Sequence, residues 1–423
     1  MEKYLDAAVK SISQSIRFDS SRGERTGNMP FGKGAYDCLQ HFLSLAQTMG
    51  FETHDYDGYA GEVVFGEGEE FGILCHLDVV PAGSGWTKDP FGGVVEEGRI
   101  WGRGAVDDKG PAICCLYALK ALKDEGFTPE KKIKLIVGCN EESGWACIDH
   151  YNEVAHMPEI GFSPDADFPV IYAEKGILHL RLHFPLNGKA PFLRLEGGEI
   201  PNMVCDFCTT TPRSINRKRA AACGLSIEDN RLVARGKCAH GSTPERGVNA
   251  IEPVLRYFKD KLPAAARALE CLFDDVYGLK KLHDETGNLT ISPNVIRFRR
   301  GELQILCDIR YPATFALADV FKEIDCFGVK YETLQYQAPL FADKKSALVQ
   351  TLLGVYEECT GKKAQPIAIG GGTYARALKQ GVAFGPECEG DEPVIHRADE
   401  YITVERVKLL LEIYKKAIEK LTK

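Results

Sequence analysis

Residues 71–80 read Phe-Gly-Ile-Leu-Cys-His-Leu-Asp-Val-Val, and this stretch decides the fold. Its nearly continuous apolar character is typical of a buried strand in a parallel sheet. A neighbouring strand is predicted over Glu62–Phe65. Further along, Pro111–Gly126 predicts a helix, with Pro near its start and Gly after its last turn, and Lys132–Cys139 predicts another buried strand. Strands that alternate with helices predict an α/β fold around a central, mostly parallel sheet.

Shorter elements on either side extend this pattern. Helical spacing of apolar residues, or short apolar runs for the strands, predict each of them. Ser143 is expected to cap the helix over Gly144–Tyr151. The elements are helices over Asp6–Ile16, Tyr36–Gly50 and Gly144–Tyr151 and strands over Phe162–Pro164 and Val170–Ala173.

The character of the sequence changes after Gly176. Residues 178–184 alternate between apolar and polar side chains, which predicts a strand with one solvent-exposed face. Two predicted helices and a hairpin follow, which together indicate an antiparallel α+β fold. Around Gln337 the α/β pattern returns. The segments are helices over Ala250–Leu262 and Ala264–Tyr277, a hairpin over Val295–Arg310, and later helices over Lys344–Cys359 and Val404–Lys420.

We therefore predict two domains. One is a discontinuous α/β domain made of residues 1–176 and 339–423, and the other is an inserted α+β domain over residues 177–338. A chain of 423 residues is long enough for both. With 44% hydrophobic and 26% charged residues, the composition is that of an ordinary globular protein.

Charge and cysteine content limit the possible partners and the compartment. A net charge of −8 argues against nucleic acid as the main partner, because that needs clustered Lys and Arg. No apolar run approaches the roughly 20 residues that span a membrane, and Met1–Phe18 lacks the apolar segment of a signal peptide. The 15 cysteines, an odd number, predict reduced thiols in a cytoplasmic protein. Cys205 and Cys208 have metal-site spacing without a second pair, so packing is the simpler interpretation.

His76 and Asp78 stand where the first buried strand is predicted to end. Side chains two residues apart share a face of a strand, so both should point the same way at the carboxyl edge of the sheet. Open α/β sheets place their sites at that edge. The pair suits a metal-binding imidazole oriented by a carboxylate, although a purely structural pair has the same pattern.

Acidic residues follow the next strands at intervals of about one βα unit. Asp107-Asp108 precedes a helix, where an N-cap is the alternative interpretation. Glu141-Glu142 could supply a metal ligand and a general base, or form an exposed acidic turn. Two further acids, Asp165 and Asp167, end a short strand, and His396 precedes the last helix. Imidazole and carboxylate ligands without cysteine suit two divalent ions bridged by one carboxylate, and Zn²⁺, Co²⁺ and Mn²⁺ all qualify.

In their order along the chain, these motifs resemble the co-catalytic zinc peptidases, a superfamily that includes aminoacylase, carboxypeptidase G and succinyl-diaminopimelate desuccinylase. The resemblance covers nearly the whole chain. Three stretches, Ser163–Asp165, Gly372–Arg376 and Gly381–Gly385, most resemble the PepV-type dipeptidases of that superfamily. The matching motifs are His76–Pro81, Gly85-Trp86, Asp89–Phe91, Gly102–Gly104, Asp107–Gly110, Glu141-Glu142, Ser163–Asp167, His240–Ser242, Asn249-Ala250 and Gly371–Arg376.

The resemblance implies a role for each metal-site residue. His76 and Asp165 would hold one zinc ion, and Glu142 and His396 would hold the other. Asp107 would bridge the two ions and be followed by a cis peptide bond. Asp78 would orient His76, and Glu141 would be the general base that takes a proton from a bridging water.

Residues of the insertion, which would be the family's lid, also acquire roles. His240 would stabilise the oxyanion, Arg310 would bind the substrate carboxylate, and Asn202 would add a hydrogen bond. Independently of the resemblance, the Gly370–Gly372 loop lies at a predicted helix start, which suits an anion. Gly371, Gly372 and Thr373 are therefore further candidates for substrate binding. The loop lacks the Lys-Ser/Thr of a phosphate loop, which argues against nucleotide binding.

The resulting hypothesis is a cytoplasmic di-zinc dipeptidase whose partner is a small peptide substrate. An N-acyl-amino-acid deacylase with the same metals is the alternative, and a binding protein without activity is a remote one. The presence of the whole ligand set together with Glu141 favours an enzyme. The long insertion, with added material over Lys259–Leu289, predicts a monomer whose His240 acts in its own active site, with a homodimer as the alternative.

Overall fold

The computed structural model describes all residues from Met1 to Lys423, and they form two units. Unit 1 comprises Met1–Tyr172, Ala342–Ile367 and Thr373–Lys423. Unit 2 comprises Ala173–Phe341 and a short returning segment, Ala368–Gly372. The insertion expected over residues 177–338 falls inside unit 2, whereas the return of residues 368–372 was not anticipated.

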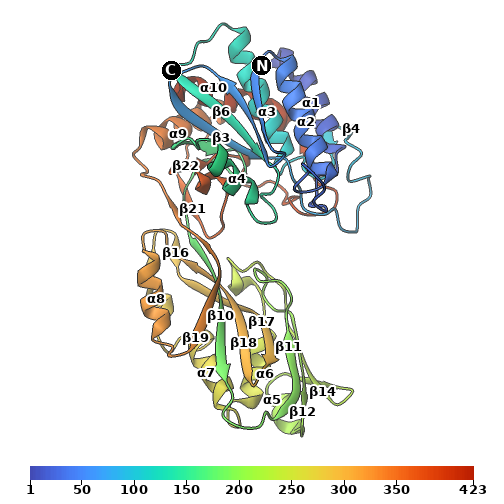
Figure 1. The fold of residues 1–423 in the computed structure, drawn as a ribbon, viewed down its shortest axis with the longest axis vertical. Helices are drawn as coiled ribbons and strands as arrows, with labels where there is room; N and C mark the ends of the chain where they lie inside the picture. Colours follow the sequence, from blue (N-terminus) through green and yellow to red (C-terminus); the bar gives the residue numbers. More distant parts are fainter. The chain divides into compact units, whose positions relative to one another are not determined.

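Unit 1 is built around one sheet whose strands run in the order β1-β2-β6-β3-β7-β22-β9; Figure 1 labels β3, β6 and β22 of this sheet. The pairs β3–β6, β3–β7 and β7–β22 are parallel. The pairs β1–β2, β2–β6 and β22–β9 are antiparallel. The strands are β1 Glu52–Tyr56, β2 Ala60–Phe65, β3 Glu69–His76, β6 Lys131–Gly138, β7 Ile160–Ser163, β9 Ile171–Glu174 and β22 Gln380–Ala383. The sheet is therefore mixed, with its parallel pairs in the middle, and the prediction of a mostly parallel sheet was wrong at the edges.

Helix α3, Lys109–Asp124, lies at the centre of the helical packing in unit 1. It contacts α1, α10 and strand β3. Thirteen of its residues are buried, among them the small residues Ala112, Cys114 and Cys115, which let neighbouring elements approach closely. This burial fixes the start of α3, which directly follows Asp107-Asp108. The other helices of unit 1 are α1 Glu2–Ile16, α2 Lys33–Thr48, α4 Ala146–Val154, α9 Ala347–Thr360 and α10 Val404–Leu421.

Unit 2 contains an eight-stranded sheet in the order β13-β14-β12-β11-β17-β18-β10-β19. Its strand pairs are antiparallel, as in β10–β18 and β17–β18. Along β10, Leu178, Leu180 and Leu182 all point into the core, as the predicted alternation requires. The strands are β10 Gly176–Pro185, β11 Phe192–Gly197, β12 Phe207–Pro212, β13 Ser226–Glu228, β14 Arg231–Arg235, β17 Thr290–Arg299, β18 Glu302–Tyr311 and β19 Lys330–Gln337.

Helices α6 and α7 pack against this sheet (Figure 1). Together with the apolar side chains of the strands they enclose the core of unit 2. The helices of the unit are α5 Arg217–Ala222, α6 Ile251–Phe258, α7 Pro263–Leu272 and α8 Leu317–Asp325. None of the helices in the chain combines the length and the apolar character that crossing a bilayer requires.

Several local predictions differ from the structure. Strand β3 ends at His76 and not at Val80, because the chain leaves the sheet there. Helix α4 begins after Trp145, whose left-handed conformation (φ 67°) starts it, so Ser143 is not its cap. The glycine loop leads only into a four-residue 3-10 turn, Tyr374–Ala377, and not into a longer helix.

Candidate active site

The parallel strands of unit 1 bring separate acidic motifs to one edge of the sheet. His76 is the last residue of β3, Glu141 and Glu142 follow β6, and Asp165 follows β7. Neighbouring parallel strands have their carboxyl ends at the same edge, which places these side chains near one another. Asp107 reaches the same place from the loop before α3.

The carboxylate of Asp107 lies between two groups of potential ligands. Its Oδ1 is 2.9 Å from His76 Nε2, and that nitrogen is 3.5 Å from Asp165 Oδ2. Its Oδ2 is 2.9 Å from His396 Nε2, which in turn is 2.9 Å from Glu142 Oε1. The two oxygens of one carboxylate therefore face two different imidazoles.

On the His76 side, the arrangement of the ligand atoms suits a bound cation better than a direct hydrogen bond between His76 and Asp107. His76 Nδ1 donates to the main-chain oxygen of Asp78 at 2.9 Å, so in a neutral ring Nε2 carries the lone pair. Although His76 Nε2 and Asp107 Oδ1 are only 2.9 Å apart, both are buried and neither makes a hydrogen bond. Two acceptor atoms side by side suit a shared positive ion. His76, Asp107 and Glu142 place ligand atoms within 4.8 Å of one another.

Asp78 contacts both His76 and the turn that carries Glu141 and Glu142. Its carboxylate lies 3.7 Å from His76 Nδ1, whose hydrogen bond goes to the main-chain oxygen of the same residue. The carboxylate itself accepts the main-chain N–H of Glu141 at 2.9 Å and that of Glu142 at 3.1 Å. Asp78 thus fixes the turn that carries the acidic pair, and its carbonyl orients the imidazole.

A similar contact holds the backbone of His76. The peptide bond Asp107–Asp108 is cis, as the resemblance implies. Asp108, which is fully buried, accepts the main-chain N–H of His76 at 3.1 Å. The buried carboxylate of Asp108 therefore positions the backbone of His76, as the carboxylate of Asp78 positions that of Glu141 and Glu142.

Glu141 is held by a residue that the sequence analysis missed. The indole N–H of Trp145 donates to Glu141 Oε1 at 3.1 Å. Burial raises the pKa of Glu141 well above its ordinary value, and the nearby carboxylates act in the same direction. The only signal in the sequence was an aromatic residue four positions after a candidate base.

In unit 2, the predicted substrate residue Arg310 is held by Asp308. Arg310 donates to it through Nε at 2.7 Å and Nη2 at 2.9 Å. The main-chain N–H of Gly241 donates to the carbonyl of Asn202 at 2.7 Å. A Cβ at Gly241 would stand 2.2 Å from Asp308 Oδ2, so this position needs glycine. The loop that carries His240 thus lies against Asp308, beside Asn202.

The remaining predicted residues have separate places. His240 is exposed, and its Nδ1 is hydrogen bonded with Ser242 Oγ at 2.7 Å. Gly371 and Gly372 belong to the returning segment of unit 2, whereas Thr373 belongs to unit 1. The hydroxyl of Thr373 accepts the N–H of Ala375 at 3.3 Å and caps the short 3-10 turn.

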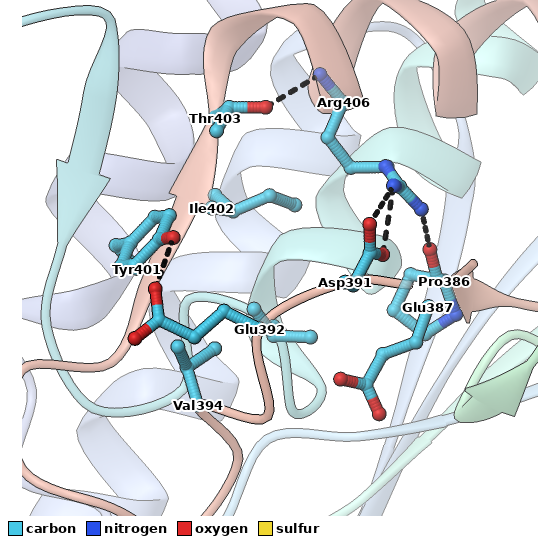
Figure 2. Close-up of a pocket in the computed structure, with 10 residues that line it drawn as sticks. Pro386, Glu387, Asp391, Glu392, Val394, Tyr401, Ile402, Thr403 and Arg406 are labelled. Carbon is cyan, nitrogen blue, oxygen red and sulfur yellow. Dashed lines mark hydrogen bonds and ion pairs between the residues drawn. The ribbon is translucent and has the colours of Figure 1, made fainter. Parts of the chain in front are cut away.

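A cavity of about 100 Å³ adjoins the loop of Asp107 in unit 1 (Figure 2). Val106, Val394 and Ile402 are among the residues that line it. Arg406 binds both oxygens of Asp391, at 2.9 and 2.7 Å. Burial, with the neighbouring acids, raises the pKa of Glu387 in this cavity to about 7.

Comparisons with known proteins show which family and which folds the chain is similar to. Residues 72–420 match the model of the family described as Peptidase family M20/M25/M40. The chain is 36% identical to the Beta-Ala-Xaa dipeptidase of Lactobacillus delbrueckii subsp. lactis, covering 100% of this chain and 97% of that protein. In fold it is similar to the human carnosine dipeptidase 1 (TM-score 0.60, 13% identity, 100% and 97% coverage). It is also similar to the di-peptidase Dug1p of Saccharomyces cerevisiae (TM-score 0.62, 12% identity, 100% and 97% coverage).

Proposed function

The chain belongs to the M20/M25/M40 peptidase family, and on that basis we propose that it is a dipeptidase that works with two divalent cations, preferably zinc. The observation that carries the proposal is the position of Asp107, whose two oxygens each lie 2.9 Å from a different histidine nitrogen. One carboxylate between two imidazoles is the arrangement that a pair of bridged ions requires.

Five residues would hold the ions. Asp107 would contribute one oxygen to each, with His76 and Asp165 completing one ligand set and Glu142 and His396 the other. Imidazole and carboxylate ligands suit Zn²⁺, and Mn²⁺ or Co²⁺ would also fit. When bound, such ions act as Lewis acids and bring the pKa of a water molecule close to neutrality.

The chain's own acid–base residue would be Glu141. In the proposed reaction its carboxylate takes a proton from the attacking water, whose oxygen bonds to the acyl carbon of the substrate. The C–N bond then breaks, and Glu141 returns the proton to the leaving amine. Because Trp145 holds Glu141 Oε1, the other oxygen is the one assigned to proton transfer.

Unit 2 would act as the lid that binds the rest of the substrate. Asp308 accepts from Nε and Nη2 of Arg310, and we assign the remaining nitrogen, Nη1, to the substrate carboxylate. His240 would stabilise the oxyanion, and Asn202 would add a hydrogen bond. The Gly371–Thr373 loop is kept as a further candidate for substrate contact, although the 3-10 turn that follows it is too short to act as a helix terminus.

A hydrolysis screen tests this function. The purified protein is offered dipeptides, tripeptides and N-acetyl-amino acids, with its zinc content measured by elemental analysis and Glu141→Gln as the inactive control. We expect hydrolysis of dipeptides and about two zinc ions per chain. Preference for N-acetyl-amino acids would instead indicate the deacylase of the same superfamily. On the argument from cysteine content, we further propose that the protein works in the cytoplasm, and on the length of the insertion we propose that it is a monomer.

A further inference from the structure

We propose that Glu400 is a positioning residue that ties together the two chain segments carrying Asp107 and His396. The proposal rests on the metal site proposed above. Glu400 is fully buried and lies four residues after His396, at the far end of the sequence from Asp107.

Both carboxylate oxygens of Glu400 accept hydrogen bonds from the loop before α3. Oε1 lies 3.1 Å from the main-chain nitrogen of Gly104, 3.0 Å from that of Val106 and 3.4 Å from that of Asp107. Oε2 accepts from Arg103 Nη1 at 2.6 Å. The carbonyl oxygen of Glu400 also accepts the N–H of Gly102 at 2.9 Å. One residue therefore binds the loop at five points.

These contacts bear directly on the geometry of the site. Val106 and Asp107 lie between strand β5, Arg99–Trp101, and helix α3, so their N–H groups have no strand or helix partner. Buried main-chain N–H groups need an acceptor, and Glu400 is that acceptor. Because it contacts the backbone of Asp107 itself, it sets the position of that carboxylate relative to the segment that carries His396.

Beside these hydrogen bonds, a cavity interrupts the apolar packing between the segment of Asp107 and the segment of His396. Val106, Val394 and Ile402 line the cavity of about 100 Å³ described above, and Figure 2 shows the last two. Atoms that border a cavity have fewer partners on that side and hold one another less firmly. Glu400 directly precedes Tyr401 and Ile402, which line this cavity, and it bridges the two segments by hydrogen bonds.

A different role must be distinguished from positioning. Arg103 is a buried cation, and Glu400 could serve only to neutralise it. Removing one partner of a buried ion pair destabilises the fold whatever else that partner does. The test therefore removes the ion pair in both variants that are compared.

The experiment compares two double variants, Arg103→Met/Glu400→Gln and Arg103→Met/Glu400→Leu. Both lack the ion pair and have a side chain of similar size, but only Gln can accept from the main-chain N–H groups. Co²⁺ affinity is measured by competition with a chelator, and the visible absorption of bound Co²⁺ reports ligand geometry. We expect the Leu variant to bind Co²⁺ about 10–100-fold more weakly than the Gln variant, with an altered spectrum.

Equal Co²⁺ affinities and spectra in the two double variants would overturn the proposal, even if their melting temperatures differ. If the Leu variant does not fold, Arg103→Met/Glu400→Gln is compared with Arg103→Met, both of which lack the ion pair, where a charged acceptor becomes a neutral one and several-fold weaker binding is expected. Unchanged binding there would also overturn it. Glu392→Gln, an exposed acid on the same segment, is the control expected to match wild type. Wild-type protein that binds no Co²⁺ would instead refute the metal site.

Discussion

Trp145 donates its indole N–H to Glu141 Oε1 across 3.1 Å. The contact is possible because Trp145 takes a left-handed conformation at the start of α4, four residues after the base. A hydrogen bond to one carboxylate oxygen restricts the rotation of the other. Trp145 is therefore expected to influence the rate of proton transfer without binding metal.

Trp145→Phe should lower kcat about tenfold, which corresponds to the loss of roughly 1.4 kcal/mol from a hydrogen bond to a charged group. The zinc content and KM should stay close to wild type. Steady-state kinetics with elemental analysis checks this. Trp101→Phe, which has no contact with Glu141, is the matched control, and an equal loss in both variants would contradict a specific role.

Glu141→Gln should reduce turnover by roughly 10²–10⁴-fold while the protein keeps its metal. The reason is that a general base lowers the barrier of the reaction and does not hold the ions. Single-turnover kinetics and elemental analysis of the same sample check both parts. Activity near that of wild type would show that another residue is the base.

Asp107→Ala should lose metal rather than only activity, because each of its oxygens faces a different histidine. We expect less than one zinc ion per chain after dialysis, against about two in wild type. Asp167→Ala, in the same acidic stretch as Asp165 but outside the ligand set, is the control. Two tightly held ions in Asp107→Ala would rule out the bridging role.

The acid stability of unit 2 should depend on Asp308. Burial alone would raise the pKa of Asp308, but the imidazole of His179, 3.6 Å away, and the hydrogen bonds from Arg310 outweigh burial and lower it. A carboxyl group whose folded pKa lies below its unfolded value, about 3.9, stabilises the fold above that pH. This contribution is lost as the pH falls through the folded pKa.

The melting temperature of Asp308→Asn should therefore fall furthest below that of wild type near neutral pH. The gap should narrow below about pH 4, where Asp308 of the unfolded wild-type chain begins to take up a proton while the folded state still holds it charged. Melting curves from pH 7 to pH 2 check this, with the exposed Asp206→Asn as control. A gap that stays constant over the whole range would show that the charge of Asp308 does not contribute.

The proposed monomer predicts that His240 acts in its own chain. His240→Ala and Glu141→Ala should each be inactive alone, and mixing them should restore no activity. Light scattering should give the mass of one chain. Recovered activity in the mixture would mean that His240 of one chain serves the site of another.

The sequence predicts the residues of the candidate site better than it predicts the contacts that position them. The positions of His76, Glu142 and Asp165 follow from strands that end at one edge of a sheet, a rule that depends on local pattern alone. Strand direction at the sheet edges does not follow, because β2 and β9 have the same apolar character whichever way they run.

Contacts between distant segments could not be predicted for a different reason. Alternation along a strand places the side chain of Asp78 but does not say whether its carbonyl or its carboxylate meets His76. Glu400 bonds to Val106 across 294 positions of sequence, and no periodicity relates two such residues. Trp145 was missed because its backbone conformation, and not its residue type, directs the ring to Glu141.

The short return of residues 368–372 to unit 2 has a consequence for protein engineering. The chain passes between the units after Tyr172, Phe341, Ile367 and Gly372, so unit 2 is assembled from two separate pieces of sequence. A chimaera that exchanges only residues 173–341 with a relative would combine most of one unit with a foreign segment at 368–372. Recombination that respects the fold must exchange both pieces together, and libraries with crossovers at all four positions should yield more folded proteins than those with two.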